Sequence, residues 1–215
     1  MAIKLSKRHF WQWFIRNHKE YLEFHNKPQK ELKYWMNELS AHLRAYFKFL
    51  HYSVYVGKEG AVGVLTISVA GKARYFKYVD AIVAIAPAIP GWTIQALEAP
   101  RPIDSFWEEE LGHAGIDPHE LWCTVPQGED LPGIAVYHML YAEAKHRLYA
   151  LAAEMAVYNV LGERSFGVDI GSITIGNLSG APEDAELIKL EELPAYMPRC
   201  YSSFVVDATG RMWER

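Results

Sequence analysis

The stretch from Val79 to Ile103 constrains the fold more than any other part of this sequence. Four prolines interrupt it, and its middle carries no charged side chain. Apolar residues at helical spacing open the stretch. Pro87 and Pro90 must end that helix, because a proline ring clashes with the preceding turn and has no N–H to donate. Residues 92–97 then alternate like a strand that is buried on at least one face. The stretch therefore predicts a helix, a rigid corner and a central strand.

Charged side chains follow the end of this strand, at Glu98, Arg101 and Asp104. Ligand sites are commonly built from polar groups where buried strands end. We therefore look for a functional site in this part of the chain.

The composition favours a folded protein over a disordered one. Half of the 215 residues are hydrophobic and 13% are aromatic, which is enough to form a substantial core. No apolar run has the length of a signal peptide or of the roughly 20 residues of a membrane span. Cys123 and Cys200 are too few and too far apart for a disulfide framework or a zinc site. We therefore expect a soluble, cytoplasmic protein with inert thiols and no membrane partner.

The charge is distributed unevenly along the chain. Residues 1–80 hold 14 Lys and Arg against 6 Asp and Glu, whereas residues 81–215 hold 8 against 20. One interpretation is a basic surface for an anionic partner. The other is that the two parts neutralise each other. We favour the second and expect no nucleic-acid partner, because the basic residues are spread along the backs of predicted helices.

Two amphipathic helices are predicted at the N-terminus, over residues 8–25 and from Pro28 to about Leu50. Each carries aromatic or aliphatic residues at three- and four-residue spacing. Because the linker between them is short, they should pack as an antiparallel hairpin within residues 1–51. Asn17 projects from the aromatic face of the first helix. It either bonds to neighbouring backbone or presents its amide to a ligand.

Two later stretches share one order of predicted elements. Residues 52–98 and residues 121–175 both read as strand, strand, helix, strand. The fold class is therefore α+β, with the helical hairpin packed on a pseudo-duplicated core of mixed sheet. We expect one domain spanning residues 1–215, in which residues 52–103 form the first α+β half and residues 104–215 the second. The strands of the two halves form either one continuous sheet or separate sheets.

Within these halves, several finer predictions depend on local pattern alone. Residues 74–78 extend the first strand ladder, and Gly162 ends the helix of the second half, before a strand over residues 167–175. An acidic surface excursion with a short helix is predicted over residues 182–198. The residues expected on the inner face of the helix over residues 142–161 are Leu148, Leu151, Met155 and Tyr158.

No sequence motif for catalysis, for a cofactor loop or for a metal cluster is present. Glu143 and His146 form a Glu-x-x-His pair, but di-iron bundles need two such pairs. We therefore predict no metal and no cofactor. Polar residues at predicted element ends remain as candidates. The catalytic candidates are Glu98, Arg101, His138 and Glu163, and the ligand-binding candidates are Asn17, Trp92, Arg101 and Arg164.

Two segments, APAIPGW-x-IQAL (residues 86–97) and LGERSFGVDIG (residues 161–171), resemble segments of uncharacterised bacterial cytoplasmic proteins grouped as a domain of unknown function. The opening FWQWF…N (residues 10–17) is similar too. The resemblance implies a bacterial protein of unassigned role and brings no catalytic residues with it.

The absence of a nucleophile motif favours a non-catalytic binding or interaction protein, such as an immunity-type protein or a regulatory adaptor. Its partner would be another protein or a small ligand. The alternative is a hydrolase or transferase that acts on an anionic small molecule. In that case Glu98 or Glu163 would serve as general base and Arg101 or Arg164 would hold the anion.

Overall fold

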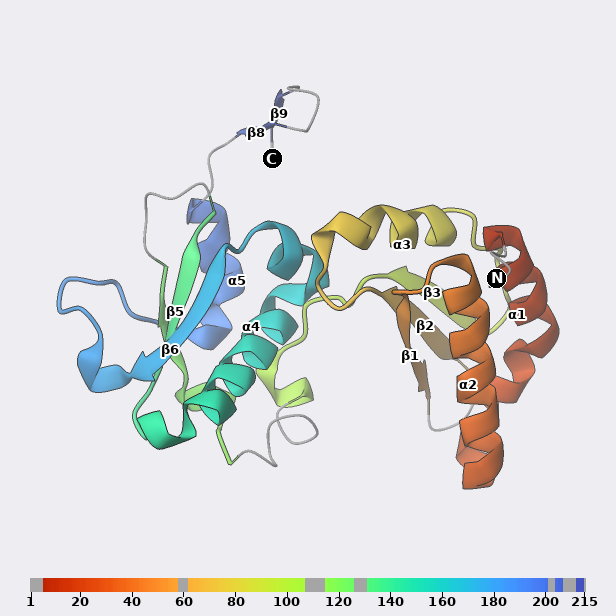
Figure 1. Cartoon of the computed structure of the whole chain (residues 1–215), viewed down its shortest axis with the longest axis horizontal. Helices are drawn as coiled ribbons and strands as arrows, with labels where there is room; N and C mark the ends of the chain where they lie inside the picture. The colour runs from red at the N-terminus through yellow and green to blue at the C-terminus, as the bar shows by residue number, and fades with distance from the viewer. Residues whose placement is uncertain are drawn as a thin grey trace. The chain divides into compact units, whose positions relative to one another are not determined.

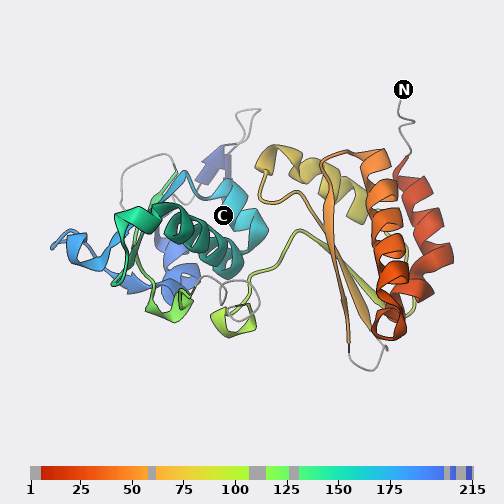
Figure 2. The same ribbon diagram turned by 60° about the horizontal axis from the view of Figure 1, so that its bottom comes forward.

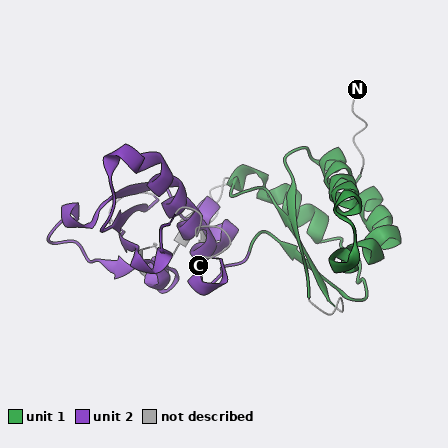
Figure 3. Cartoon of the chain, turned by 90° about the horizontal axis from the view of Figure 1, so that it is seen from below, with its two compact units in different colours: residues 1–98 green, residues 99–215 purple. Residues whose placement is uncertain are grey.

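The computed structural model describes residues 6–57, 62–106, 115–125, 131–200, 204–206 and 212–214, with side chains as far as Pro198. The chain divides into two compact units, residues 1–98 and residues 99–215 (Figure 3). That the whole chain acts as one domain stays a prediction. A short helix that the sequence suggests after Ser105 lies mostly outside the described residues.

The main elements follow the chain in the order labelled in Figure 1. Those of the first unit are α1 (Lys7–Leu22), α2 (Gln29–Tyr46), β1 (His51–Val56), β2 (Gly63–Ser68), α3 (Phe76–Val83) and β3 (Trp92–Ala96). Those of the second unit are β4 (Trp122–Thr124), β5 (Gly133–His138), α4 (His146–Val168), β6 (Ser172–Asn177), β7 (Ile188–Lys189), α5 (Leu193–Tyr196), β8 (Phe204–Val206) and β9 (Met212–Glu214).

The predicted helical hairpin is confirmed, and α1 and α2 lie side by side (Figure 2). Near the turn, the hydroxyl of Tyr21 donates to the carbonyl of Trp35 at 2.8 Å. Farther along, the ring of Trp13 stacks on His42 with centroids 4.1 Å apart. From the first pair to the second, the residue number falls along α1 and rises along α2, as an antiparallel hairpin requires.

The sheet of the first unit has the order β1-β2-β3. Strand β1 pairs with β2 in antiparallel fashion, and β2 pairs with β3 in parallel fashion across the α3 crossover. Leu65 and Ile67 of β2 point into a core shared with α1, α2 and α3. The alternate residues Thr66 and Ser68 point to the other face. One face of this sheet is therefore apolar, as the alternation of side chains along a strand requires.

Residues 74–78 do not extend the strand ladder, so that prediction was wrong. They form a 3₁₀ turn (Ala73–Tyr75) that runs directly into α3. The physical reason is the spacing of the apolar residues. Phe76, Val79 and Ile82 recur every three residues and are all buried, which places them on one face of a helix.

The second unit repeats this topology in a separate sheet of order β6-β5-β4-β7. Strand β4 pairs with β5 in antiparallel fashion, and β5 pairs with β6 in parallel fashion across α4. The pseudo-duplicated order of elements and the α+β class are therefore confirmed. Among the described strands, none joins the two sheets. The strands of the two halves therefore form separate sheets and not one continuous sheet.

Helix α4 differs from its prediction at Gly162. The backbone there leaves the helical region, with φ 73° and ψ 161°, but the helix resumes and continues to Val168. Gly162 is thus a break within the helix and does not end it. As a consequence, the strand predicted from residue 167 begins only at Ser172.

The inner face of α4 was predicted only in part, since Met155 packs against the core but two of the predicted leucines are exposed. Leu148 and Leu151 are 39% and 55% exposed. Of the ten buried residues of α4, six are small, namely Ala152, Ala153, Ala156, Val157, Val160 and Gly162, and the others are Tyr149, Asn159, Leu161 and Glu163. Because apolar residues surround much of this helix, their spacing does not identify one face. The alanines allow the helix axis to lie close to the sheet.

From Ile188 on, the segment over residues 182–198 belongs to the core, contrary to the predicted surface excursion, whereas its first residues are exposed and its predicted short helix is present as α5. Ile188 of β7 pairs with Cys123 of the central strand β4. Leu190, Leu193 and Met197 are buried in the same cluster as α4. The acidic side chains of this segment had suggested a solvated loop, but its leucines alternate with them. The last strands, β8 and β9, pair in antiparallel fashion.

Candidate functional site

A pocket of about 380 Å³ lies in the second unit, where three short 3₁₀ segments meet the side of α4. These segments are Ile103–Ser105, Pro118–Glu120 and Leu190–Glu192. The residues that line the pocket are Pro100, Arg101, Pro102, Ile103, Asp104, His119, Val160, Glu191 and Pro194. We call this the His119 pocket.

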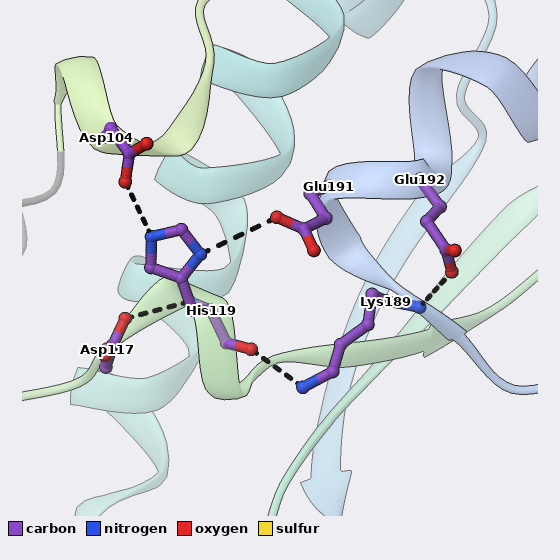
Figure 4. A network of polar contacts seen from close by, with 6 residues as sticks. All are labelled: Asp104, Asp117, His119, Lys189, Glu191 and Glu192. Atoms are coloured by element: carbon purple, nitrogen blue, oxygen red, sulfur yellow. Dashed lines mark hydrogen bonds and ion pairs between the residues drawn. The ribbon is translucent and has the colours of Figure 1, made fainter.

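The imidazole of His119 lies between two carboxylates (Figure 4). Its Nε2 is 3.0 Å from Oδ1 of Asp104, and its Nδ1 is 3.6 Å from Oε2 of Glu191. The side chains of Asp104 and Glu191 are 87% and 57% exposed, so both carboxylates are accessible from solvent. Exposed ion pairs of this kind add little to stability. We therefore consider what these two carboxylates could bind.

The backbone around His119 is fixed from two sides. Asp117 accepts the N–H of His119 at 2.9 Å through its side chain, and Pro118 occupies the first position of the turn. From the other side, Nζ of Lys189 donates to the carbonyl of His119 at 2.9 Å. The backbone N–H of Lys189 in turn donates to Glu192 (Figure 4). The imidazole is therefore carried by a well-anchored turn.

Arg101 also lines the pocket, and its side chain is held by neighbouring groups. Its guanidinium donates to the carbonyl of Ser105 at 2.7 Å and approaches Oδ1 of Asn159 at 3.4 Å. Its backbone N–H donates to the carbonyl of Asn159 at 2.8 Å. The ring of Phe106 lies 5.7 Å from the guanidinium carbon. These contacts hold Arg101 along the segment that enters the pocket.

The break at Gly162 lets this segment lie against α4. A Cβ atom at Gly162 would come within 2.7 Å of the Pro100 ring and of its backbone nitrogen. Only glycine combines the positive φ with such a close approach. Because Gly162 has no side chain, Pro100 and the pocket residues that follow it can pack directly against α4.

The chemistry of the lining is restricted. It combines two carboxylates, one imidazole and one guanidinium with an apolar floor of proline, isoleucine and valine side chains. No serine, threonine, cysteine or lysine lines this pocket among the described residues. The described lining therefore offers no hydroxyl, thiol or amine nucleophile.

The structure brings Arg101 and Asp104 together, as the sequence suggests for charges after β3. Glu163 and Arg164 follow the break in α4 and do not line the pocket. The side chain of Glu163 is fully buried, whereas Arg164 is exposed.

His138 ends β5 and is almost completely buried. Its Nδ1 accepts the N–H of Leu140 at 3.1 Å. Its Nε2 lies 3.3 Å from Oε2 of Glu120, although the angles do not meet those of a hydrogen bond. His138 therefore neighbours the turn that carries His119 but does not line the pocket.

The remaining candidates lie in the first unit. Glu98 accepts a hydrogen bond from Ser53 at 2.9 Å. Asn17 donates to the carbonyl of Trp13 at 2.7 Å, which is the backbone alternative given above. Trp92 packs edge-on against Phe14 with centroids 5.0 Å apart. None of these three residues lines the His119 pocket.

A second pocket of about 460 Å³ runs between α4 and the edge strand β6. Its ionisable residues are His146 and Glu154. Nδ1 of His146 lies 2.9 Å from the hydroxyl of Tyr141, which donates to Glu143. The Glu-x-x-His pair of the sequence is therefore bridged by a tyrosine. No residue predicted from the sequence lines this second pocket.

His119 and Glu191 were missed by the sequence analysis. The Asp117-Pro118 pair is a turn signal that could have drawn attention to the next residue, His119. Glu191 lies in a segment that the sequence analysis treated as a surface excursion. Among the described residues, no group of three or more His, Cys, Asp or Glu side chains is arranged to hold a metal ion.

Comparison of the chain with protein-family models, curated proteins and solved structures gives no match. Within the described part of the chain, no helix combines the length and the apolar character needed to cross a membrane.

Proposed function

We propose that this is a non-catalytic binding protein whose His119 pocket takes up a cationic group. The observation that carries the proposal is the position of the His119 imidazole between Asp104 and Glu191, with each ring nitrogen facing a carboxylate of its own chain. A general base needs a ring nitrogen directed at its substrate. This imidazole instead orients two exposed carboxylates towards the pocket.

The pocket favours an amine or a guanidine that carries an apolar stem. A cation at the rim would form charge-assisted hydrogen bonds with Asp104 and Glu191. Ile103, Val160 and Pro194 would contact the stem. The group belongs either to a small free molecule or to a Lys or Arg side chain of a partner protein.

The alternative of a hydrolase or transferase acting on an anion has weaker support. Its proposed bases Glu98 and Glu163 and its further catalytic candidate His138 do not line this pocket. Arg101 lines it, but its guanidinium already donates to the Ser105 carbonyl. A bacterial, cytoplasmic setting is part of our proposal and derives from the sequence resemblance over residues 86–97 and 161–171.

Calorimetry on the full chain tests this function, with agmatine and cadaverine as cationic probes and phosphate as the anionic probe. We expect both cations to bind and phosphate to fail. The double variant Asp104→Asn/Glu191→Gln should bind the cations at least about tenfold more weakly, since two charge-assisted contacts are lost. Glu183→Gln removes an exposed carboxylate outside the pocket and should leave binding unchanged.

Two outcomes would contradict the proposal. Phosphate binding that is lost in Arg101→Gln would favour the anion-acting alternative. If Asp104→Asn/Glu191→Gln and Glu183→Gln weaken cation binding equally, the cations are attracted by the net charge alone. To separate a free amine from a partner side chain, peptides with one internal lysine are compared with cadaverine at equal ionic strength.

A further inference from the structure

Four aromatic and three basic side chains gather in the first unit, where the residues after α2 meet the start of α3. The members of this aromatic–cation patch are Phe47, Lys48, Phe49, Arg74, Tyr75, Lys77 and Tyr78. They come from two segments that lie about 25 residues apart in the sequence. The fold therefore creates the patch, and no single stretch of sequence contains it.

The rings form two stacks, each with nearly parallel ring planes, and the planes of the two stacks are inclined to each other by 58–68°. Phe47 stacks on Tyr78 with centroids 3.9 Å apart and ring planes 10° apart. Phe49 stacks on Tyr75 at 4.8 Å and 10°. Phe47 also meets Tyr75 edge-on at 5.1 Å, which joins the two stacks. All four rings are half-buried, so they are held in place and still reachable from solvent.

A basic side chain lies over three of these rings. Nζ of Lys48 is 4.7 Å from the centroid of Phe49, and Nζ of Lys77 is 5.4 Å from that of Tyr78. The guanidinium carbon of Arg74 is 4.6 Å from the centroid of Tyr75. All three basic residues are exposed. Their positive charges are thereby concentrated around the stacked rings.

The unit that carries the patch is basic as a whole. Residues 1–98 contain 14 Lys and Arg against 7 Asp and Glu. The sequence alone predicts no nucleic-acid partner, because its basic residues are spread along the backs of predicted helices. The fold changes that premise, since it brings Lys48 next to Arg74 and Lys77 across the stacked rings.

We infer that the aromatic–cation patch binds single-stranded nucleic acid. Proteins that bind single strands combine positive charges that follow the phosphates with aromatic rings on which bases stack. Every base has a π face, so such binding tolerates any sequence. A cation over an exposed ring is held weakly. A base can therefore replace Arg74 or Lys77 on its ring while the freed charge turns to a phosphate.

Other polyanions match this patch less well. An anionic membrane surface or an acidic protein segment would satisfy the three charges but would offer no row of flat rings to the aromatic stacks. The inference is independent of the proposed function, because it concerns different residues in the other unit of the chain.

Fluorescence anisotropy with the full chain and labelled oligothymidylate of about 12 nucleotides tests the inference. We expect binding at about 20 mM salt that weakens steeply towards about 200 mM. Arg74→Gln/Lys77→Gln should weaken it more than about tenfold. Because each lost phosphate contact lowers the salt slope by about 0.7 for single strands, the slope should fall by about 1.4.

The charge-matched control is Lys30→Gln/Lys33→Gln. Both lysines are exposed on the first turns of α2, at the opposite end of that helix from Phe47. This variant should change the affinity by less than about twofold. Equal losses in the two double variants would overturn the inference, because they would show that only net charge matters. Circular dichroism of both variants confirms that they are folded.

A second arm tests the aromatic rings. An abasic strand of the same length and charge should bind more weakly than oligothymidylate by about tenfold, and Phe49→Leu should shrink that difference. An abasic strand that binds equally well would overturn the inference. So would stronger binding to phosphatidylserine vesicles, or displacement of the oligonucleotide by polyglutamate at equal charge, since these point to a membrane or an acidic protein. Absence of oligonucleotide binding at low salt would overturn it as well.

Discussion

The crossover helices of the two units connect the same kind of strand pair with very different side chains. In the first unit, α3 has 8 residues and buries Phe76, Val79 and Ile82. In the second unit, α4 has 23 residues and buries mainly alanine and valine, and it is broken at Gly162. Bulky side chains keep a short helix in contact with its sheet, whereas small ones let a long helix lie close to it. One strand topology thus accepts two packing solutions.

The surfaces of the two units differ as strongly as their cores. Residues 99–215 contain 8 Lys and Arg against 19 Asp and Glu, in contrast to the basic first unit. The first unit presents the aromatic–cation patch, and the second presents carboxylates around His119. Shared backbone order therefore says nothing about shared ligands.

The largest effect is expected from removing the break that only the second helix has. Gly162→Ala forces a side chain into a backbone region with positive φ and against Pro100. We expect a loss of about 3–4 kcal/mol in the free energy of unfolding, measured by urea titration. Gly180→Ala adds a methyl group with no atom within 4 Å and should cost less than about 0.5 kcal/mol. Equal stability of the two variants would show that Pro100 yields easily.

A second variant tests the close packing of α4. Ala156 is fully buried in the core cluster of α4 and lines neither pocket, so Ala156→Leu must displace its neighbours. Overpacking of this kind should cost about 2 kcal/mol, again by urea titration. If the free energy of unfolding is unchanged, the helix has room to move away from the sheet, and the contrast with α3 disappears.

Cys123 provides a titration that belongs to the second unit alone, since both cysteines of the chain lie there. Burial in the central strand raises the pKa of this thiol from its ordinary 9.0 to about 12. Below pH 9 the thiol is protonated in both states. As the pH rises from 9 towards 12, only the unfolded state loses the proton, so stability falls. In a Cys200→Ser background, we expect a loss of about 1 kcal/mol by pH 10 that is absent in Cys123→Ala.

The same thiol can show whether the units unfold together. Labelling of Cys123 by iodoacetamide requires the second unit to open. If its midpoint in urea coincides with the loss of tryptophan fluorescence, to which the four tryptophans of the first unit contribute most, the units unfold as one. Separate midpoints would sharpen the difference between them.

The smallest effect is expected on the outer face of α4. Leu151 is 55% exposed, so Leu151→Gln should change the free energy of unfolding by less than about 0.5 kcal/mol. A loss of 2 kcal/mol or more would restore the inner-face role that the helical spacing first assigned to this residue.

The order of strands and helix along the chain in both units could be predicted from the sequence because alternation along strands and proline or glycine corners are local signals. The orientation of α4 could not, because a helix with apolar residues on most sides gives no preferred face. Residues 74–78 were assigned to a strand because aromatic residues fit both a strand and a helix, and contact with the core decides between them.

The candidate site was only half predictable. Arg101 and Asp104 follow a recognisable strand end, so their position suggested a role. His119 and Glu191 join them through tertiary contacts, over separations of 15 residues or more. A periodic pattern in the sequence reports local structure and does not predict such a tertiary contact. The same reason explains the aromatic–cation patch, whose two halves were visible in the sequence but whose contact was not.

The pairing of β7 with β4 has a consequence for the order of events during synthesis. Lys189 pairs with Trp122, which precedes it by 67 positions. At about 5–20 residues per second, the partner of β4 leaves the ribosome about 3–13 seconds after β4 itself. The first sheet is complete by then, while the second has an open edge. With only three residues, β4 offers little for a neighbouring nascent chain to pair with, so its shortness protects the chain during this interval.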